Sequence, residues 1–240
     1  MNFRAQQLAL TIRLRERAVF DSYVPSINIA AVQQLRWLAS GAHAGVVWLS
    51  GPGGVGKSHL LQASCALARS VGLDGVYLPL TELVDLGPEA LEGWHRSGIV
   101  AIDDADAIAG RADWERAVFR LYREVQESGA ALLTAAKEVP QRVAFSLPDL
   151  GSRFAAATLL PLRTLDEAGQ REALQLRARA RGLELPQETA LYLQRRFRRD
   201  LPTLYQLLDA IDEASLQAQR RLTVPFIRQV LSRTSPGLPE

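Results

Sequence analysis

The stretch from Ser50 to His59, SGPGGVGKSH, has the residue types and the spacing that hold a phosphate group. It fits the pattern G-x-x-x-x-G-K-[ST], in which glycines let backbone N–H groups turn toward phosphate oxygens. Lys57 is expected to reach the β- and γ-phosphates, and Ser58 to ligate Mg²⁺. The alternative is a glycine turn that merely joins a strand to a helix. The predicted nucleotide-binding residues of this stretch are Gly51, Pro52, Gly53, Gly54, Val55, Gly56, Lys57, Ser58 and His59.

Two adjacent carboxylates complement this loop. Asp103 and Asp104 follow the apolar residues of IVAIDD, at the carboxyl end of a predicted strand. Ligands of open α/β sheets bind at that end of the strands. We expect Asp103 to serve a Mg²⁺ ion together with Ser58, and Asp104 to polarise an attacking water. The alternative is that the two acids only cap the strand.

The elements that must position these groups alternate along the first two thirds of the chain. Helices are predicted near 20–41, 57–71 and 113–129. Short apolar runs typical of buried strands lie at 45–50, 75–80, 98–106, 130–136 and 156–162. Strands that alternate with helices predict a parallel sheet with helices on both faces.

The pattern changes after residue 163, where only helical periodicity remains. The sequence TLDE fits a capping box with Thr164 as the N-cap and Glu167 three residues later. Helices are expected from there to about Arg181 and then at 187–198, 201–220 and 224–233. We therefore predict an N-terminal extended segment, a sheet domain, a small helical domain and a disordered tail, at 1–16, 17–163, 164–233 and 234–240.

Composition excludes some classes of protein. Of the 240 residues, 48% are hydrophobic and 22% charged, as in ordinary globular domains. No apolar run approaches the roughly 20 residues that span a bilayer, so no membrane partner is expected. A net charge of +2 argues only weakly for direct nucleic-acid binding, and the single cysteine, Cys65, excludes an internal disulfide. These features predict a cytoplasmic protein.

Two arginines extend the set of candidate residues. Arg153 lies in LPDLGSRF before the last predicted strand, and Arg199 in RRDLPTLYQLLD near the start of a helix. Together with the glycine loop and the paired aspartates, this ordered set resembles the AAA+ ATPases. The resemblance implies a five-stranded parallel P-loop sheet flanked by helices, followed by a helical lid. Arg199 then matches the sensor 2 arginine, and Arg153 the arginine finger that enters a neighbouring subunit's site. Each arginine alone is equally compatible with an exposed surface side chain.

Longer segments narrow the resemblance to the DnaA-related family, and within it to the short regulatory-inactivator homologues. They include SGPGGVGKSHLLQA, AIDDADAIAG, EALQLRARARGLELP and LTVPFIRQVL. The resemblance implies ADP or ATP with Mg²⁺ as cofactor, the initiator DnaA as partner, and promotion of hydrolysis of the ATP that DnaA holds. It also makes Phe20, Tyr23 and Val24 of FDSYV candidates for contacts with the nucleobase. Because the sequence ends after the predicted lid, we expect no helix-turn-helix domain.

The N-terminal sequence QLALTI is similar to the short peptides with which such homologues bind the β subunit sliding clamp of DNA polymerase. The contact residues would be Gln7, Leu8, Leu10 and Ile12. The clamp would then bring the protein to DNA indirectly. Alternate apolar residues also fit a strand that pairs with the protein's own sheet or with another copy of the chain, which leaves a homo-oligomer open.

One position departs from the family pattern. Ala136 stands at the sensor 1 position, where the initiator group usually has an acidic residue, and Thr134 is a partial substitute. We therefore expect little unaided hydrolysis, which fits the ADP-bound state that the resemblance implies. The alternative functions are a helicase loader or another AAA+ remodelling adaptor, a small-molecule kinase that acts as a monomer, and a DNA-binding module.

Overall fold

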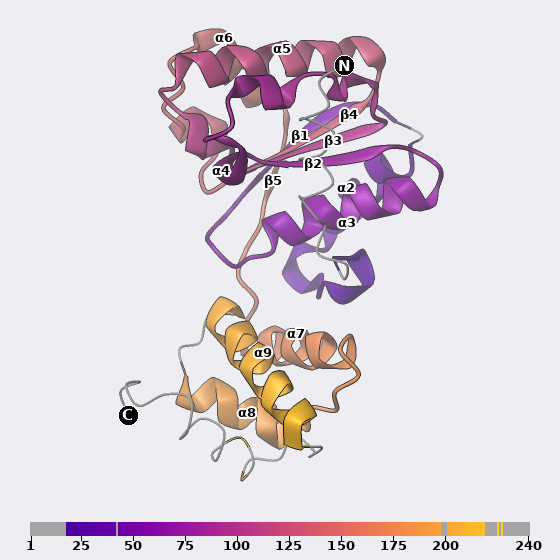
Figure 1. Ribbon diagram of the computed structural model, residues 1–240, viewed down its shortest axis with the longest axis vertical. Coiled ribbons are helices and arrows are strands. Elements are labelled where there is room, and N and C mark those ends of the chain that lie inside the picture. Colours follow the sequence, from indigo (N-terminus) through magenta and orange to yellow (C-terminus); the bar gives the residue numbers. More distant parts are fainter. Residues whose placement is uncertain (1–17, 42, 198–200, 219–224, 226, 228–240) are drawn as a thin grey trace. The chain divides into compact units, whose positions relative to one another are not determined.

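The computed structural model describes residues 18–41, 43–197, 201–218, 225 and 227 (Figure 1). They form two compact units. The first, the sheet unit, comprises the described residues up to Asp21 and Ile27–Thr164. The second, the lid unit, comprises Ser22–Ser26 and the described residues from Leu165 onward.

The sheet unit is built on five strands in the spatial order β2-β3-β4-β1-β5. Every pair of neighbouring strands is parallel. Their bounds are β1 (Gly45–Ser50), β2 (Gly75–Pro79), β3 (Ile99–Asp103), β4 (Ala131–Ala136) and β5 (Thr158–Pro161). The predicted parallel five-stranded fold is confirmed. Because the strands are parallel, the loop after β1 and the end of β3 lie at the same end of the sheet, where the carboxyl ends of the strands meet.

Helices cover both faces of this sheet, as expected for a parallel sheet. In Figure 1, α5 and α6 lie on one side of the strands, and α2 and α3 on the other. The bounds are α2 (Ile29–Ala39), α3 (Lys57–Ser70), α4 (Leu80–Leu83), α5 (Ala112–Ser128) and α6 (Pro148–Ala155). Short 3-10 helices are Phe20–Ser22, Ser26–Asn28, Pro88–Leu91, Trp94–Arg96, Ala105–Ile108 and Pro140–Arg142.

Aromatic side chains fill the core under α5 and α6. The ring of Phe154 lies 4.9 Å from that of Trp48 and 6.0 Å from that of Tyr122, measured between centroids. Trp48 Nε1 donates a 2.9 Å hydrogen bond to the carbonyl of Glu138, so its one polar atom is satisfied although the side chain is fully buried. Phe154 therefore anchors α6 to the sheet by its buried face.

A buried carboxylate ties the loop before α6 to α5. Glu115 is fully buried. Its Oε1 accepts the backbone N–H groups of Gly110 at 2.7 Å and Ser146 at 3.0 Å, and its Oε2 accepts that of Leu147 at 2.6 Å. Because Leu147 is the N-cap of α6, Glu115 fixes the start of the helix that carries Arg153.

The lid unit consists of helices in its described part, as predicted: α7 (Glu167–Arg179), α8 (Gln187–Arg196) and α9 (Leu201–Ala218). Its own small core joins the three helices. Buried apolar members of this core are Leu174, Ala178, Leu193, Leu204, Leu208, Ile211 and Ile227. The predicted helix at 224–233 lies mostly outside the described residues, as do the segment 1–16 and the tail 234–240.

The predicted capping box at Thr164 is wrong. Helix α7 begins at Glu167, and its N-cap is Asp166, whose Oδ1 accepts the backbone N–H of Gly169 at 2.8 Å. Aspartate is among the best N-cap residues, and its negative charge also interacts favourably with the helix dipole. Asp166 therefore competes successfully with the threonine two positions earlier.

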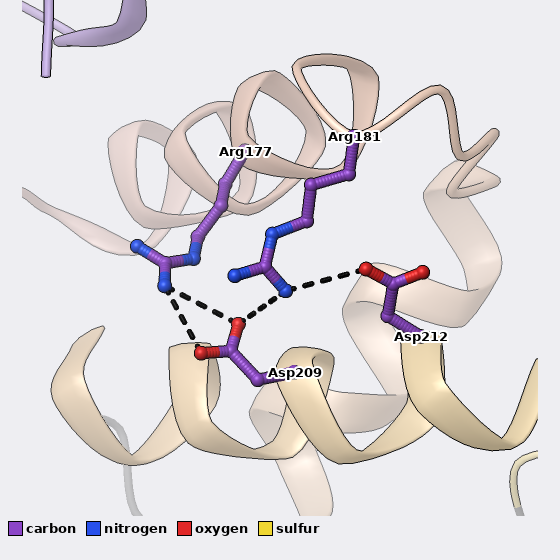
Figure 2. Close-up of polar contacts among 4 residues, drawn as sticks. All are labelled: Arg177, Arg181, Asp209 and Asp212. Carbon is purple, nitrogen blue, oxygen red and sulfur yellow. Dashed lines mark hydrogen bonds and ion pairs between the residues drawn. The ribbon is translucent and has the colours of Figure 1, made fainter. Parts of the chain in front are cut away.

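Ion pairs join α7 to α9 inside the lid. Figure 2 shows Arg177 and Arg181 of α7 pointing toward Asp209 and Asp212 of α9. Arg177 Nη2 lies 3.1 Å from Asp209 Oδ2, and Arg181 Nη1 lies 2.6 Å from Asp209 Oδ1 and 3.4 Å from Asp212 Oδ2. The guanidinium of Arg177 also stacks 4.4 Å from the ring centroid of Tyr205. This network holds two of the lid helices in register.

None of the helices in the described part of the chain is long and apolar enough to cross a membrane.

Candidate functional site

The loop between β1 and α3 has a conformation that its glycines make possible. Gly54 and Gly56 have φ angles of +77° and +98°, in the left-handed region that glycine adopts without strain. A Cβ on Gly51 would lie 2.6 Å from the carbonyl oxygen of Leu162, so that position has no room for a side chain. Pro52, Gly53 and Gly54 are exposed, so the loop is open to a ligand.

Helix α3 begins directly after this loop, with Gly56 as its N-cap and no side-chain cap. The first N–H groups of a helix lack partners within the helix. Together with the helix dipole they favour a negatively charged group at this end. The exposed hydroxyl of Ser58 lies in this first turn.

Lys57 adds a positive charge beneath the loop. Its side chain is 7% exposed, and its Nζ donates hydrogen bonds to the carbonyls of Gly51 at 2.6 Å and Pro52 at 3.0 Å. Burial lowers the pKa of Lys57, and the negative charges of Asp103 and Asp104 oppose that shift. The ammonium group thus lies near both predicted carboxylates.

Asp103 ends β3 and is 1% exposed. Its Oδ2 accepts a 2.7 Å hydrogen bond from the hydroxyl of Tyr77, and its Oδ1 accepts the backbone N–H of Asp104 at 3.0 Å. Among the described residues it makes no ion pair. Burial, with a contribution from Asp103, raises the pKa of Tyr77 well above its ordinary value. The hydroxyl therefore stays protonated and donates a hydrogen bond to the carboxylate.

Asp104 has a backbone conformation that is rare for residues other than glycine, with φ +53° and ψ +47°. Its Oδ2 accepts a hydrogen bond of 3.1 Å from Thr81 Oγ1. Burial raises the pKa of Asp104, and the charge of Asp103 raises it further. Such strained residues cluster at functional sites.

The next strand, β4, supplies one spare polar atom. Thr134 is fully buried, and its Oγ1 has no hydrogen-bond partner among the described residues. It pairs in register with Ile102, the residue before Asp103. Ala136 is also buried and offers no polar group. Lys137 follows it and is exposed, and its charge contributes to lowering the pKa of Lys57.

The predicted base-binding residues divide between the two units. Phe20 belongs to the sheet unit and is 5% exposed, with the guanidinium of Arg36 stacked 4.7 Å from its ring centroid. Tyr23 and Val24 belong to the lid unit. His59 hydrogen-bonds through Nε2 to the carbonyl of Val19 at 3.0 Å, so it anchors the segment that leads to Phe20.

Arg153 is an exposed residue of α6, one turn after the buried Leu150 and directly before the buried Phe154. Within the described part of the chain it has no ion-pair partner. The amphipathic pattern of α6 therefore directs this guanidinium to the surface. Arg199 and the four N-terminal residues Gln7, Leu8, Leu10 and Ile12 lie outside the described residues.

The sheet unit thus brings together Lys57, Ser58, Asp103 and Asp104 at one edge of the sheet. Sequence reasoning missed Tyr77 and Thr81, the two hydroxyls that hold the aspartates. A phosphate with Mg²⁺ requires backbone N–H groups, an ammonium, a hydroxyl and carboxylates, and all four kinds of group are present here. The described residues therefore fit a magnesium nucleotide.

A separate open hollow of about 480 Å³ lies on the lid, where α7 is joined to α8. It is lined by Gln175, Arg179, Gly182, Leu183, Glu184, Leu185, Pro186 and Gln187. None of the predicted site residues is among them.

Comparison with known proteins gives two kinds of similarity. Residues 166–231 match the family model described as "Hda, lid domain". The crystal structure of domain III of the Thermotoga maritima replication initiation protein DnaA is 20% identical, with a TM-score of 0.78, over 94% of this chain and 100% of that one.

Two nucleotide-bound initiators share the fold as well. Replication initiator DnaA bound to AMPPCP and single-stranded DNA is 19% identical, with a TM-score of 0.66, over 86% of this chain and 69% of that one. AMPPCP-bound DnaA from Aquifex aeolicus is 19% identical, with a TM-score of 0.60, over 78% of this chain and 61% of that one.

Proposed function

We propose that this chain, a DnaA-like AAA+ protein of the Hda type, is a regulator that promotes hydrolysis of the ATP bound to DnaA and so restrains the initiation of DNA replication. The observation that carries the proposal is the exposed Arg153 on α6, which has no ion-pair partner among the described residues. An arginine at a surface is available to another molecule's triphosphate, whereas a buried one is not.

The chain's own site would hold ADP or ATP with Mg²⁺. The N–H groups of Gly53, Gly54 and Gly56 would bind phosphate oxygens, and Lys57 would neutralise their charge. Ser58 and Asp103 would hold the metal ion. Nucleotide with Mg²⁺ would supply the phosphoanhydride bond and a counter-charge for the carboxylates. The remaining nucleotide contacts of this proposal are Pro52, Val55, His59, Phe20, Tyr23, Val24 and Arg199.

Unaided hydrolysis at this site is proposed to be slow. Asp104 is the residue that would polarise the attacking water, and burial raises its pKa. Ala136 brings no polar group to the end of β4. A long-lived bound nucleotide, ADP in the resting state, suits a protein that acts on a partner rather than as an ATPase.

Arg153 would act in trans, as an arginine finger. A guanidinium next to a transferring phosphoryl group stabilises the charge that develops in the transition state, which raises the rate by about 10³–10⁵. The buried Phe154 and the Glu115 carboxylate hold α6 in place, so the finger would be presented on a rigid support. Rigid placement matters because misplacing such a group by about 1 Å can cost a factor of 10² in rate.

Gln7, Leu8, Leu10 and Ile12 would bind the sliding clamp, with the glutamine as hydrogen-bonding group and the apolar residues as anchors. The clamp encircles DNA, so the protein would meet DNA-bound DnaA at raised effective concentration. A weak contact between the two AAA+ domains then suffices. Cytoplasmic location is part of the same proposal.

The proposal is tested by single-turnover hydrolysis of ATP preloaded on DnaA. Wild-type protein with DNA-loaded clamp is expected to accelerate hydrolysis, and Arg153→Ala to remove at least 100-fold of that acceleration while still binding nucleotide and clamp. Arg142→Ala is the matched control, because Arg142 is an exposed arginine that pairs with Glu138 at 3.4 Å. Stimulation that survives in Arg153→Ala would refute the role of this arginine.

The tether is tested separately, by binding of a Gln7→Ala, Leu10→Ala variant to purified clamp. A loss of at least tenfold in affinity is expected, because both the hydrogen-bonding group and an apolar anchor are removed. Unchanged affinity would refute the clamp tether, and binding to the replicative helicase instead would favour a loader or another remodelling adaptor.

A further inference from the structure

We propose that Tyr77 is a positioning residue for the metal: its hydroxyl holds Asp103 in the orientation that serves Mg²⁺, so the hydroxyl sets how much Mg²⁺ tightens nucleotide binding. This inference rests on the proposed nucleotide site and identifies a residue that makes it selective for the magnesium complex.

The geometry fixes both oxygens of Asp103. Tyr77 lies on β2, whose register places it beside Ala101 of β3, two residues before Asp103. Its Oη donates to Asp103 Oδ2 at 2.7 Å, while the backbone N–H of Asp104 binds Oδ1 at 3.0 Å. With one donor on each oxygen and 1% exposure, the carboxylate is held in one orientation.

The same hydroxyl also faces the other half of the proposed metal site. Interactions with the side chains of Gln62 and Ser58 of α3 oppose the rise in the pKa of Tyr77, so both side chains lie close to its hydroxyl. Ser58 and Asp103 are the two proposed metal-holding residues, and they come from elements that are far apart in the sequence. The Tyr77 hydroxyl therefore interacts with both of them.

The number of hydrogen bonds that a carboxylate can accept explains why the Tyr77 hydroxyl does not compete with the metal for Asp103. Each oxygen of an ionised carboxylate has two acceptor sites, so one donor on each leaves a free site for Mg²⁺ or for a water bound to it. A tyrosine hydroxyl that remains protonated can only donate its hydrogen to the carboxylate. It therefore orients Asp103 without withdrawing it from the metal.

Removing the hydroxyl leaves Asp103 Oδ2 buried without its donor. The carboxylate is then expected to turn toward Lys57, because a buried charged group needs a partner. This change weakens the metal-dependent part of binding. The contacts of phosphate with the loop do not involve Tyr77 and are expected to persist.

The test is the affinity of the full chain for ADP, measured by titration calorimetry with excess Mg²⁺ and with EDTA. In Tyr77→Phe the gain in affinity from Mg²⁺ is expected to fall about tenfold, while the affinity in EDTA stays within about twofold of wild type. Tyr122→Phe is the matched control, because Tyr122 is a buried tyrosine of α5 packed against Phe154, and it is expected to behave as wild type.

Two outcomes would overturn the inference and leave the proposed function intact. The first is a Tyr77→Phe variant in which Mg²⁺ increases the affinity for ADP as much as in wild type. The second is an equal loss of affinity with Mg²⁺ and with EDTA, which would make Tyr77 a packing residue. Wild-type protein that binds ADP equally with and without Mg²⁺ would also overturn it. If wild-type protein binds no nucleotide under either condition, the proposed function itself is refuted.

Discussion

Two carboxylates, Asp103 of the sheet unit and Asp209 of the lid unit, are satisfied in opposite ways. Asp103 is 1% exposed and has only uncharged donors, the Tyr77 hydroxyl and a backbone N–H. The side chain of Asp209 in the lid is 43% exposed and pairs with both Arg177 and Arg181 (Figure 2). The lid charges neutralise one another, whereas the negative charge of Asp103 has no ion-pair partner within the described part of the chain.

This difference points to Asp103 as a functional charge. A buried charge without an ion pair is costly. Glu115, which is also buried, meets that cost with three backbone donors, whereas Asp103 has two donors and lies at the end of a strand, where sites are found. Lys57, whose charge interacts with that of Asp103, binds the loop carbonyls instead. A metal ion with a phosphate would complete the charge balance there, but nothing needs to be added to the lid network.

The largest expected effect on stability comes from a buried carboxylate that only backbone groups satisfy. Glu115→Ala is expected to lower the free energy of unfolding by about 3 kcal/mol, because three backbone N–H groups lose the fully buried carboxylate that accepts their hydrogen bonds. Denaturant titration measures this change. Glu127→Ala, on the exposed side of the same helix, is the control, and a loss below about 1 kcal/mol in Glu115→Ala would contradict this view of buried carboxylates.

The next largest effect is expected on ligand binding. Lys57→Ala should weaken nucleotide binding about 100-fold or more, because the phosphates lose the one ammonium held under the loop. Equilibrium binding of ADP measures it. Lys137→Ala, which removes an exposed ammonium next to the site, should change the affinity by no more than about threefold. Equal losses in the two variants would indicate general electrostatic attraction and not a built site.

A smaller effect is expected in the lid. Asp209→Asn should lower the free energy of unfolding by about 1 kcal/mol or less, because the pairs it breaks are partly exposed and are screened by solvent. The loss should shrink further in high salt. A loss as large as that in Glu115→Ala would contradict the expectation that the lid ion pairs contribute little to the free energy of unfolding.

The smallest effect is expected at Asp104 and depends on pH. Because burial raises its folded-state pKa above the ordinary 3.8, the native state binds this proton more readily than the unfolded state does. The free energy of unfolding therefore decreases as the pH rises from about 3.8 through the folded-state pKa. Asp104→Asn should be more stable than wild type at pH 7, and the advantage should shrink toward acid pH.

Denaturant titrations of wild type and Asp104→Asn across that pH range measure this difference. Asparagine tolerates the left-handed backbone of this residue, so the substitution isolates the charge. A variant that is less stable than wild type at neutral pH, or a difference that does not change with pH, would contradict the assignment.

The sequence predicts the order of elements better than their ends. Alternation of apolar runs and helical periodicity identifies the five strands, because each feature lies within one segment. The strand predicted at 98–106 stops at Asp103 because Asp104 turns into the left-handed region. The one predicted at 75–80 stops at Pro79, where α4 begins. Local apolar character alone does not reveal such turns.

The same limit applies to the site. Lys57 and Ser58 belong to one contiguous motif, so spacing alone predicts them. Tyr77 and Thr81 reach the aspartates only through the register of β2 on β3 and the turn into α4, and no spacing in the sequence encodes that pairing. The available cue is a tyrosine near the carboxyl end of a strand predicted to neighbour the one that ends in carboxylates.

The central claim is that the loop and the buried aspartate together form a magnesium–nucleotide site. The most direct test is the affinity for ADP with and without Mg²⁺ in wild type and in Asp103→Asn. We expect Mg²⁺ to tighten binding in wild type by at least about tenfold, and this gain to be lost in the variant while metal-free binding persists. A wild-type affinity that Mg²⁺ leaves unchanged, or a gain that survives in Asp103→Asn, would contradict the claim.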